Sequence, residues 1–507
     1  MTDELARLAN GVLWPGFFGT EAPEWLLGEL RDGLAGVVYF GQNIGDGLPR
    51  LSDEILRANP AALIGIDEEG GSVTRLESAT GSTLPGAAQL GRVDDVEATR
   101  ATGVELARRV GAIGGNVVLG PVADVNTDPR NPVIGVRSFG SDEGLVSRHV
   151  VAEVEGIQSR PVAACVKHFP GHGDTHLDSH HALPVISLDI DEFERVHLEP
   201  FRRAVEAGVD SIMTAHIVVP EWGPEPATLN PRVLGMLRGW GFEGVIITDA
   251  LDMAAIRETV GLGGGAAAAL AAGADLLCIG NPTNPGAAAL PDQDRQDFLA
   301  ARDGIVTALR DGSLSRERVE EAVQRNRALA STLRARAVSG HSSDGGHDVY
   351  DGESIVARAV SGAVADAAAV SVVDARRRST LAVDSAARYV ARALAGDGHT
   401  VRVDVARTTV AEQDAALDAA VAAHGLTVVL LDRPDVDDDQ RALVARAAER
   451  DPHAVAVNVG LPAERPLALP TVEVGAASRI GAEAARTRLR ASQPRGGSSP
   501  DGEGSAD

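Results

Sequence analysis

The sequence predicts an α/β protein: a (β/α)8 TIM-type barrel, then a smaller C-terminal α/β domain and a disordered tail. Three observations support this fold class. Apolar, β-type runs recur eight times between residues 11 and 280, with helical segments between them. Most of these runs are continuously apolar, as in parallel strands that are buried on both faces. Polar residues gather where the runs end, at the edge that carries the active site of such barrels.

The segments between the predicted strands, such as residues 191–208, have the apolar periodicity of amphipathic helices. Strands that alternate with helices predict a parallel sheet, and eight such units predict a closed barrel. The predicted strands lie within residues 11–19, 36–40, 63–71, 116–126, 163–173, 210–220, 244–253 and 274–280.

The barrel domain is predicted to span residues 1–337, because a helical stretch at 314–337 follows its last strand. Residues 338–352 are rich in Gly, Ser and Asp, so we predict a linker there.

A second domain is predicted over residues 353–490, where Ala-rich helical stretches separate further β-type runs. Residues 491–507 are rich in Gly, Ser and charged residues and are predicted to form a disordered tail. The runs of this domain are residues 369–375, 426–434 and 453–462.

Composition excludes several classes of function. The 507 residues are 44% hydrophobic and 23% charged, and their formal net charge is −25. Such a chain repels polyanions, so we expect no nucleic-acid partner. It contains no apolar run of some 20 residues, so we expect no membrane partner. The oligomeric state is left open.

Both cysteines, Cys165 and Cys278, lie inside apolar runs. We expect buried, reduced thiols rather than a disulfide, and reduced thiols fit a reducing compartment. The N-terminus has acidic residues near its start and lacks the apolar stretch and cleavage site of a signal peptide. These features predict a cytoplasmic protein.

The segment KHFPGHGDTHLDSHH, residues 167–181, holds five of the 13 histidines. It could bind a metal ion, transfer protons or bind the hydroxyl groups of a ligand. Its spacing matches no zinc motif, and its Pro and Gly residues predict a loop, so we expect no metal and no cofactor. Asp178 lies two residues before His180, which suits a histidine acid or base, although such a pair alone is usually surface sequence.

Further polar residues lie at or near predicted strand ends, where they would face the mouth of the barrel. Lys167 and His168 are donors suited to sugar hydroxyls or a carboxylate, whereas an isolated Lys commonly forms a structural salt bridge. The same two interpretations apply to Asp67 and Arg137. The five residues GVIIT lead directly to Asp249, where a carboxylate is costly unless it is hydrogen-bonded or takes part in chemistry.

Other features have structural interpretations. Asp249 could instead cap the following helix, but we expect Asp252 to be the cap or to face solvent. Residues 261–270, GLGGGAAAAL, lack the residues of a phosphate-binding loop, so we expect a flexible loop that enters an Ala-rich helix. Trp222 either stacks on a sugar ring or packs a loop.

Taken together, the motifs resemble glycoside hydrolase family 3, specifically its β-N-acetylglucosaminidase branch. The resemblance spans residues 10–335 in the family's order, and KHFPGHGDT is a highly specific motif. The second domain resembles the C-terminal domain of longer members only loosely. The motifs are IDEEGGSVTRL (66–76), NPVIGVRSFG (131–140), KHFPGHGDTHLDSH (167–180), MTAHIVVP (213–220) and IITDALDM (246–253).

The resemblance implies a retaining, two-step mechanism. Asp249 matches the nucleophile that forms a covalent glycosyl-enzyme. His180, oriented by Asp178, matches the acid/base of this branch. His172 and Asp174 are expected to hold the shape of the loop.

The resemblance also implies a substrate that is a small molecule or oligosaccharide with a terminal β-linked GlcNAc. Cell-wall or chitin-type fragments are expected, which suggests peptidoglycan turnover. The matching positions that bind the sugar, or line or support the site, are Asp67, Arg75, Arg137, Lys167, His168 and His216.

Three alternatives stay open at the level of sequence. A phosphorylase would use the same residues with phosphate in place of water. A non-catalytic sugar-binding protein could keep the barrel, although Asp249 and the Asp178/His180 pair argue against it. A metallohydrolase would be recognised by its metal content and its sensitivity to chelators.

Overall fold

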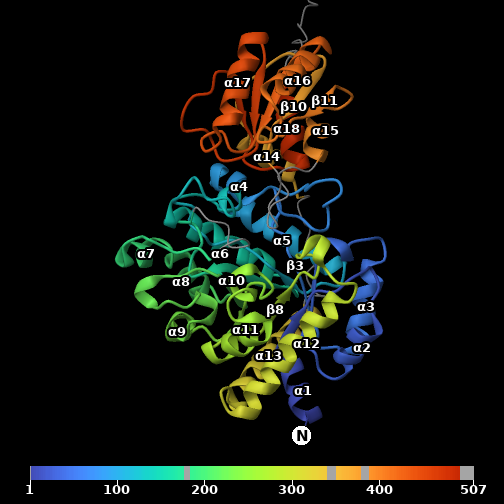
Figure 1. The fold of residues 1–507 in the computed structure, drawn as a ribbon, viewed down its shortest axis with the longest axis vertical. Coiled ribbons are helices and arrows are strands. Elements are labelled where there is room, and N and C mark those ends of the chain that lie inside the picture. The colour runs from blue at the N-terminus through green and yellow to red at the C-terminus, as the bar shows by residue number, and fades with distance from the viewer. Residues whose placement is uncertain (1, 176–182, 340–349, 378–387, 491–507) are drawn as a thin grey trace, which may run out of the picture.

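The computed structural model describes residues 2–175, 183–339, 350–377 and 388–490, which form two α/β units along the chain. In Figure 1 the second unit, drawn in orange and red, lies above the first. The predicted tail and most of the predicted linker lie outside the described residues. The predicted domain limits therefore stay predictions.

The first unit contains a parallel, curled sheet, and each predicted run between residues 11 and 280 contains one of its strands. Strands β2 to β7 pair in chain order, and β1 pairs with β8. β1 also lies beside β2, and Ile247 bridges to Leu276 just before β8, so the sheet curls back on itself. The strands are β1 (Leu13–Pro15), β2 (Gly36–Tyr39), β3 (Leu63–Ile66), β4 (Val117–Val118), β5 (Ala163–Phe169), β6 (Ser211–Thr214), β7 (Val245–Ile247) and β8 (Leu277–Gly280).

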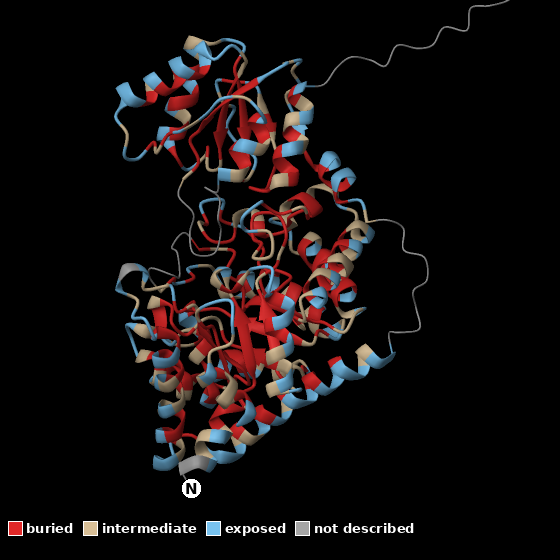
Figure 2. Ribbon diagram, turned by 90° about the vertical axis from the view of Figure 1, so that its right-hand side faces the viewer, coloured by how far each residue is buried: buried red, intermediate tan, exposed pale blue. Residues whose placement is uncertain are grey.

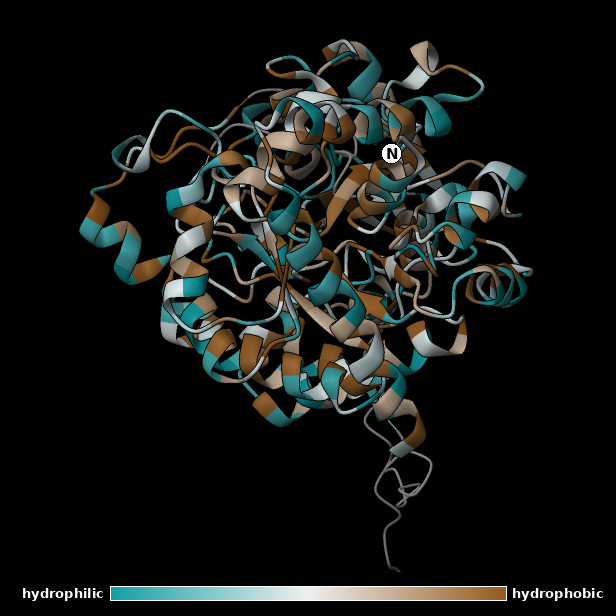
Figure 3. Ribbon diagram, turned by 90° about the horizontal axis from the view of Figure 1, so that it is seen from below, coloured by the Kyte–Doolittle hydropathy of each residue, from teal (hydrophilic) through white to brown (hydrophobic). Residues whose placement is uncertain are grey.

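Helices surround these strands, as the view from below shows (Figure 3). They are α1 (Thr2–Asn10), α2 (Glu24–Arg31), α3 (Leu48–Ala58), α4 (Ala87–Val93), α5 (Val96–Ala112), α6 (Glu143–Gln158), α7 (Ile190–Val196), α8 (Glu199–Glu206), α9 (Pro231–Gly239), α10 (Ala254–Arg257), α11 (Gly261–Ala272), α12 (Gln293–Asp311) and α13 (Arg316–Ser339). Short 3-10 helices occur at η1 (Gly41–Asn43), η2 (Gly135–Arg137), η3 (Pro220–Trp222), η4 (Ala227–Leu229) and η5 (Gly286–Ala288).

Every residue of the eight strands is buried, which explains their mostly apolar sequence (Figure 2). Strand β5 is an exception in composition, because Lys167 and His168 lie within it and are buried as well. Burying such groups is costly unless they are paired. This strand therefore locates a polar network inside the sheet.

Helix α11 corrects one prediction, because residues 261–270 are helical from Gly261 and do not begin as a loop. The glycines allow close packing against α12. A Cβ added to Gly304 on α12 would lie 2.4 Å from the carbonyl oxygen of Gly263. Trp222 is 5% exposed and packs edge-to-face on Phe193, so it packs a loop in this structure.

The second unit is an open sheet in the order β11-β10-β12-β13-β14-β9, parallel except at its β9 edge. The sequence predicted β10, β12 and β13 but missed the short outer strands β9, β11 and β14. The strands are β9 (Ser361–Gly362), β10 (Val370–Asp374), β11 (Thr400–Arg402), β12 (Leu426–Leu431), β13 (Val455–Asn458) and β14 (Thr471–Glu473). The helices are α14 (Gly352–Ala359), α15 (Arg388–Ala395), α16 (Val410–Ala422), α17 (Asp438–Arg450) and α18 (Arg479–Arg490).

Polar contacts join the two units. Gln89 on α4 donates to the carbonyl oxygen of Val474 at 3.0 Å. The amide of Ala477 donates to the hydroxyl of Ser72 at 2.9 Å. Among the described residues, no helix combines the length and apolar character that a bilayer-spanning segment needs.

Candidate active site

A cavity of about 450 Å³ lies at the carboxyl ends of the strands of the first unit. This volume falls within the range of small-molecule sites, about 300–1,000 Å³. Apolar and polar side chains share its wall. They are Val38, Phe40, Gly41, Gln42, Asp67, Arg75, Leu119, Val133, Arg137, Lys167, His168, His172, Met213, Asp249, Ala250, Met253, Cys278, Asn281, Thr283 and Asn284.

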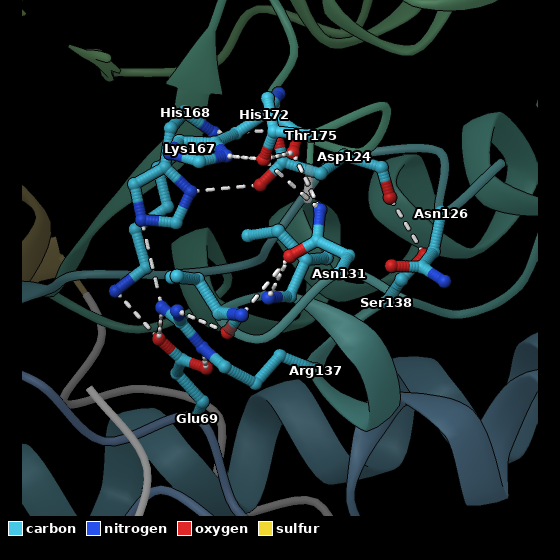
Figure 4. A network of polar contacts seen from close by, with 12 residues as sticks. Glu69, Asp124, Asn126, Asn131, Arg137, Ser138, Lys167, His168, His172 and Thr175 are labelled. Atoms are coloured by element: carbon cyan, nitrogen blue, oxygen red, sulfur yellow. Dashed lines mark hydrogen bonds and ion pairs between the residues drawn. The ribbon is translucent and has the colours of Figure 1, made fainter. Parts of the chain in front are cut away.

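Lys167 is the centre of a buried ion network at this cavity (Figure 4). Its Nζ lies 2.6 Å from Asp67 Oδ1 and 2.6 Å from Glu69 Oε1. Arg137 donates from Nε and Nη2 to the two oxygens of Glu69, at 2.9 and 2.8 Å. Arg75 donates from Nη2 to the second oxygen of Asp67 at 3.3 Å. Opposite charges therefore alternate across the whole network, which satisfies each buried charge.

The network keeps its carboxylates ionised. Burial opposes ionisation of Asp67, but the nearby Lys167 and Arg75 outweigh it and hold the pKa of Asp67 well below its usual range. Burial opposes ionisation of Glu69 too, but Arg137 and Lys167 lower the pKa of Glu69 to about 2. The site therefore presents fixed charges at neutral pH.

His168 is held by Asp124, a fully buried residue in the loop after β4. Its Nδ1 lies 2.7 Å from Asp124 Oδ2, and its Nε2 lies 3.5 Å from Nη2 of Arg137. The other oxygen of Asp124 accepts the amide of His172 at 2.6 Å. Burial opposes ionisation of Asp124, but the adjacent His168 lowers the pKa of Asp124 to about 2. One carboxylate thus fixes both the imidazole and the loop that follows it.

The first part of the KHFPGHGDT loop has a tightly constrained shape. A Cβ on Gly173 would lie 1.8 Å from a main-chain carbonyl oxygen, so only glycine fits there. Asn131 donates from Nδ2 to the carbonyl oxygen of His172 at 2.8 Å. Asp174 accepts a hydrogen bond from the hydroxyl of Thr127 at 2.9 Å. Main-chain groups of His172 and the carboxylate of Asp174 therefore contribute to the shape of this loop.

Asp249 follows β7 and lines the cavity. One of its carboxylate oxygens accepts the amide of Ala250 at 2.7 Å. His216 is fully buried behind it, with Nε2 3.0 Å from the carbonyl oxygen of Ala250 and Nδ1 2.9 Å from the hydroxyl of Thr228. His216 therefore supports the backbone next to Asp249.

The structure brings most predicted site residues into this one cavity. His216 differs, because it lies behind the wall rather than in it. Asp178 and His180 fall within residues 176–182, outside the described part of the chain, so the predicted dyad stays a prediction. The predicted site residues that line the cavity are Asp67, Arg75, Arg137, Lys167, His168 and Asp249.

Sequence reasoning missed Glu69 and Asp124. Glu69 stands in the motif IDEEGG, two residues after Asp67, and Asp124 stands in the polar ADVN end of a predicted strand. Their position at the ends of predicted strands was the signal by which they could have been found.

The interpretation of Asp252 as a helix cap or a solvent-facing residue is wrong. Its amide donates to the carbonyl oxygen of Ile279 in β8, the residue is 5% exposed, and its carboxylate accepts a hydrogen bond from Asn284 at 2.7 Å.

Among the described residues, no group of three or more His, Cys, Asp or Glu side chains could hold a metal ion. Cys165 and Cys278 are free and buried. Burial raises the pKa of Cys165 to about 12, so its thiol stays protonated.

The geometry suits a hydroxyl-rich ring. Fixed carboxylates accept hydrogen bonds from hydroxyl groups, and the fixed cations donate to them. Apolar side chains such as Met213 and Met253 offer surface to the ring. Asp249 faces the same cavity with a carboxylate that could attack an electrophilic carbon of the bound ring.

Comparison with known proteins agrees with this geometry. Residues 32–329 match the family model described as "Glycosyl hydrolase family 3 N terminal domain". The chain is 36% identical over 214 residues to Beta-hexosaminidase A of Pseudoalteromonas piscicida, a match that covers 38% of this chain and 36% of that protein. It is 35% identical over 313 residues to Beta-hexosaminidase of Xanthomonas oryzae pv. oryzae (strain KACC10331 / KXO85), covering 58% and 91% respectively.

A solved structure extends the similarity to both units. The glycoside hydrolase family 3 beta-N-acetylglucosaminidase from Paenibacillus sp. str. FPU-7 aligns with a TM-score of 0.82 at 29% identity. The alignment covers 96% of each chain.

Proposed function

Because the chain belongs to glycosyl hydrolase family 3 and is a glycoside hydrolase of the β-hexosaminidase type, we propose that it is a retaining exo-β-N-acetylglucosaminidase. It would release terminal β-linked GlcNAc through a covalent glycosyl-enzyme. We describe its curled sheet as a (β/α)8-type barrel, since β1 pairs with β8 and the strands follow chain order.

One observation carries this proposal: Asp249 shares a cavity with a fully paired network of charged groups. A cavity lined this way can orient one sugar ring by its hydroxyl groups. In the first step, an Asp249 oxygen bonds to the anomeric carbon while the glycosidic bond breaks. In the second step, water displaces Asp249, and the second inversion restores the β configuration.

Proton transfer is proposed for the His180/Asp178 pair on the basis of sequence. His180 gives its proton to the leaving oxygen in the first step and accepts a proton from water in the second. A histidine titrates near neutral pH, so it can act in both directions. Asp178 would orient the ring and stabilise its protonated form.

We propose cell-wall or chitin-type fragments as substrates, processed in the cytoplasm as part of peptidoglycan turnover. The paired charges that line the cavity support a compact terminal sugar there. The two buried free cysteines suit a reducing compartment. We propose no metal or cofactor in the reaction.

The test is release of nitrophenol from nitrophenyl β-GlcNAc, with and without phosphate and with a chelator, followed by identification of the sugar product. Free GlcNAc under all conditions, first seen as the β anomer by NMR, is expected. GlcNAc-1-phosphate in the presence of phosphate would instead make the protein a phosphorylase. Loss of activity with the chelator would indicate a metallohydrolase, and no release would favour a sugar-binding protein.

The His180 role has its own test. His180→Ala is expected to slow the first step most for substrates with poor leaving groups, because these need protonation. An unchanged rate on a natural β-GlcNAc disaccharide would contradict the assignment.

A further inference from the structure

A second cavity, of about 500 Å³, lies between the two units and outside the sugar site. One wall is the loop after β4 together with the start of α6. The facing wall is formed by the loops that follow β12 and β13 in the second unit. Its volume is that of a small-molecule site.

The cavity lies where the strand order of the second unit reverses. From β10 the chain moves to β11 on one side of the sheet, then returns to β12 on the other side. Ligands of open parallel sheets bind at the carboxyl ends of the strands at such a point. Arg377 follows β10, Asp432 follows β12, and both line the cavity.

Two guanidinium groups at the cavity have donors to spare. Arg433 donates from Nη2 to the carbonyl oxygen of Arg130 at 3.1 Å, and its Nε and Nη1 have no partner in the structure as described. Arg92 donates from Nη1 alone, to the carbonyl oxygens of Ala359 and Glu473. Within the described ranges, neither arginine has a carboxylate at ion-pair distance. Both therefore suit an anionic group of a ligand.

Most acidic groups of the wall are already engaged. Asp142 caps α6 by accepting the amide of Leu145 at 2.7 Å. Asp432 accepts the amide of Arg377 at 3.1 Å and a side-chain donor of α17 at 2.7 Å. Asp435 lies 3.4 Å from Arg441. These carboxylates are therefore held by protein groups, and Glu464 is exposed to solvent.

The remaining wall is largely apolar. The first unit contributes Ile134 and Phe139, and the second contributes Val459, Leu461 and Pro462. A ligand that fits this cavity needs an apolar body as well as an anionic group.

The two cavities share one residue, Val133. Its carbonyl oxygen accepts Nη1 of Arg137 at 3.1 Å, and the carbonyl oxygen of Ile134 accepts the amide of Arg137 at 2.9 Å. Arg137 belongs to the ion network of the sugar site. A ligand packed against Val133 and Ile134 would therefore change the position or freedom of Arg137.

We propose that the cavity between the two units is an effector site for a small organic anion with an apolar body, which alters sugar binding through residues 133–137. The ligand is separate from the sugar substrate. The ligand changes the free energy of sugar binding by a fixed amount. That amount equals the difference between the ligand's binding free energies for the sugar-bound and the sugar-free protein.

Ligand binding in this cavity is tested on the full chain with 8-anilinonaphthalene-1-sulfonate, an aromatic sulfonate whose fluorescence rises in apolar surroundings. Saturable 1:1 binding is expected in the presence of saturating GlcNAc. Arg433→Gln should weaken it at least tenfold, and Leu461→Trp should prevent it because the larger indole occupies space that the ligand needs. The control Arg407→Gln changes an exposed arginine of the same unit that does not line the cavity.

Two outcomes would overturn the effector site: unchanged binding in both cavity variants, or complete displacement of the probe by GlcNAc.

The effect of the ligand on sugar binding is tested by the KM for nitrophenyl β-GlcNAc, with the released GlcNAc measured by chromatography. Saturating probe should change KM at least twofold in the wild type and leave it unchanged in Leu461→Trp. Binding without any change in KM would overturn the coupling. The binding test needs no activity, so it stands apart from the proposed hydrolysis.

Discussion

Lys167 on β5 donates to Asp67, which follows β3, across 2.6 Å. The Lys167 side chain is 2% exposed, and in the described part of the chain Asp67 and Glu69 compensate the charge of its ammonium group. Removing one member of such a buried pair leaves an uncompensated charge, which commonly costs about 3–5 kcal/mol. The ion network of the proposed sugar site therefore also stabilises the first unit.

Lys167→Met should thus lower both stability and activity. We expect a loss of about 3 kcal/mol in the free energy of unfolding and a fall of more than 100-fold in kcat/KM. Urea unfolding and nitrophenyl β-GlcNAc kinetics measure these effects. The control is Arg57→Gln, which removes an exposed ion pair with Asp53 and should cost less than about 1 kcal/mol. Equal losses in both variants would contradict the special role of the buried network.

Asp249→Ala should abolish turnover while the protein still folds. The carboxylate is the proposed nucleophile, and Ala removes it without adding bulk. Added azide should restore some release of nitrophenol and yield the α-glycosyl azide, because azide would attack once in place of the missing carboxylate. NMR of the product checks this. Glu243→Gln, an exposed control, should keep its activity. Release of β-configured product from Asp249→Ala would exclude the role.

Glu153 predicts a pH dependence of stability. Burial, with a smaller effect of Glu69, raises the pKa of Glu153 to about 8. Between its usual pKa and pH 8 the folded protein holds a proton that the unfolded chain releases, so the free energy of unfolding falls as pH rises. The fall is at most about 1.4 kcal/mol per pH unit.

Glu153→Gln should remove this contribution. We expect the difference in unfolding free energy between pH 6 and pH 8 to shrink by up to about 2 kcal/mol, measured by urea unfolding. Glu155→Gln on the same helix changes an exposed carboxylate and should leave the pH dependence as it is. The prediction fails if the free energy of unfolding changes with pH by the same amount in both variants and in the wild type.

Gly304→Ala tests the contact between α11 and α12. Its new methyl would lie 2.4 Å from the main chain of Gly263, so the helices must separate, at a cost of about 1–3 kcal/mol. Gly264→Ala is the matched control, since its methyl would meet its nearest neighbour at 3.7 Å. It should stabilise the helix by up to about 1 kcal/mol. In thermal unfolding we expect Gly304→Ala to lower the melting temperature and Gly264→Ala to raise it. Equal changes in the two variants would contradict the close packing of α11 on α12.

The sequence predicted the parallel sheet and much of the site because both depend on local pattern. Asp67 directly follows β3 and Lys167 lies near the end of β5, and the strands of one curled sheet bring their carboxyl ends together. Glu69 was missed because its pairing with Arg137 and Lys167, which belong to segments distant in sequence, exists only in the folded chain. The chain then turns at Gly70 and Gly71, with φ of +76° and +54°, and no periodicity signals that turn.

Other errors also reflect tertiary packing. The glycines of α11 were interpreted as a loop because glycine weakens isolated helices, yet the contact with Gly304 favours them. Strands β9, β11 and β14 are only two or three residues long, and a run that short carries too little apolar pattern to be recognised as a strand. The paired arginines and carboxylates of the site are likewise contributed by segments that meet only in the folded chain.

The pairing of β1 with β8 has a consequence for how the protein is made. Leu13 pairs with Leu277, so β1 cannot form this pairing until the ribosome has synthesised β8. At about 5–20 residues per second, that delay is on the order of 10–50 s. During this time the nascent chain presents an open strand edge and a half-lined site. We expect the newly made protein to rely on chaperones in this interval, and to acquire sugar affinity abruptly after residue 280 has emerged.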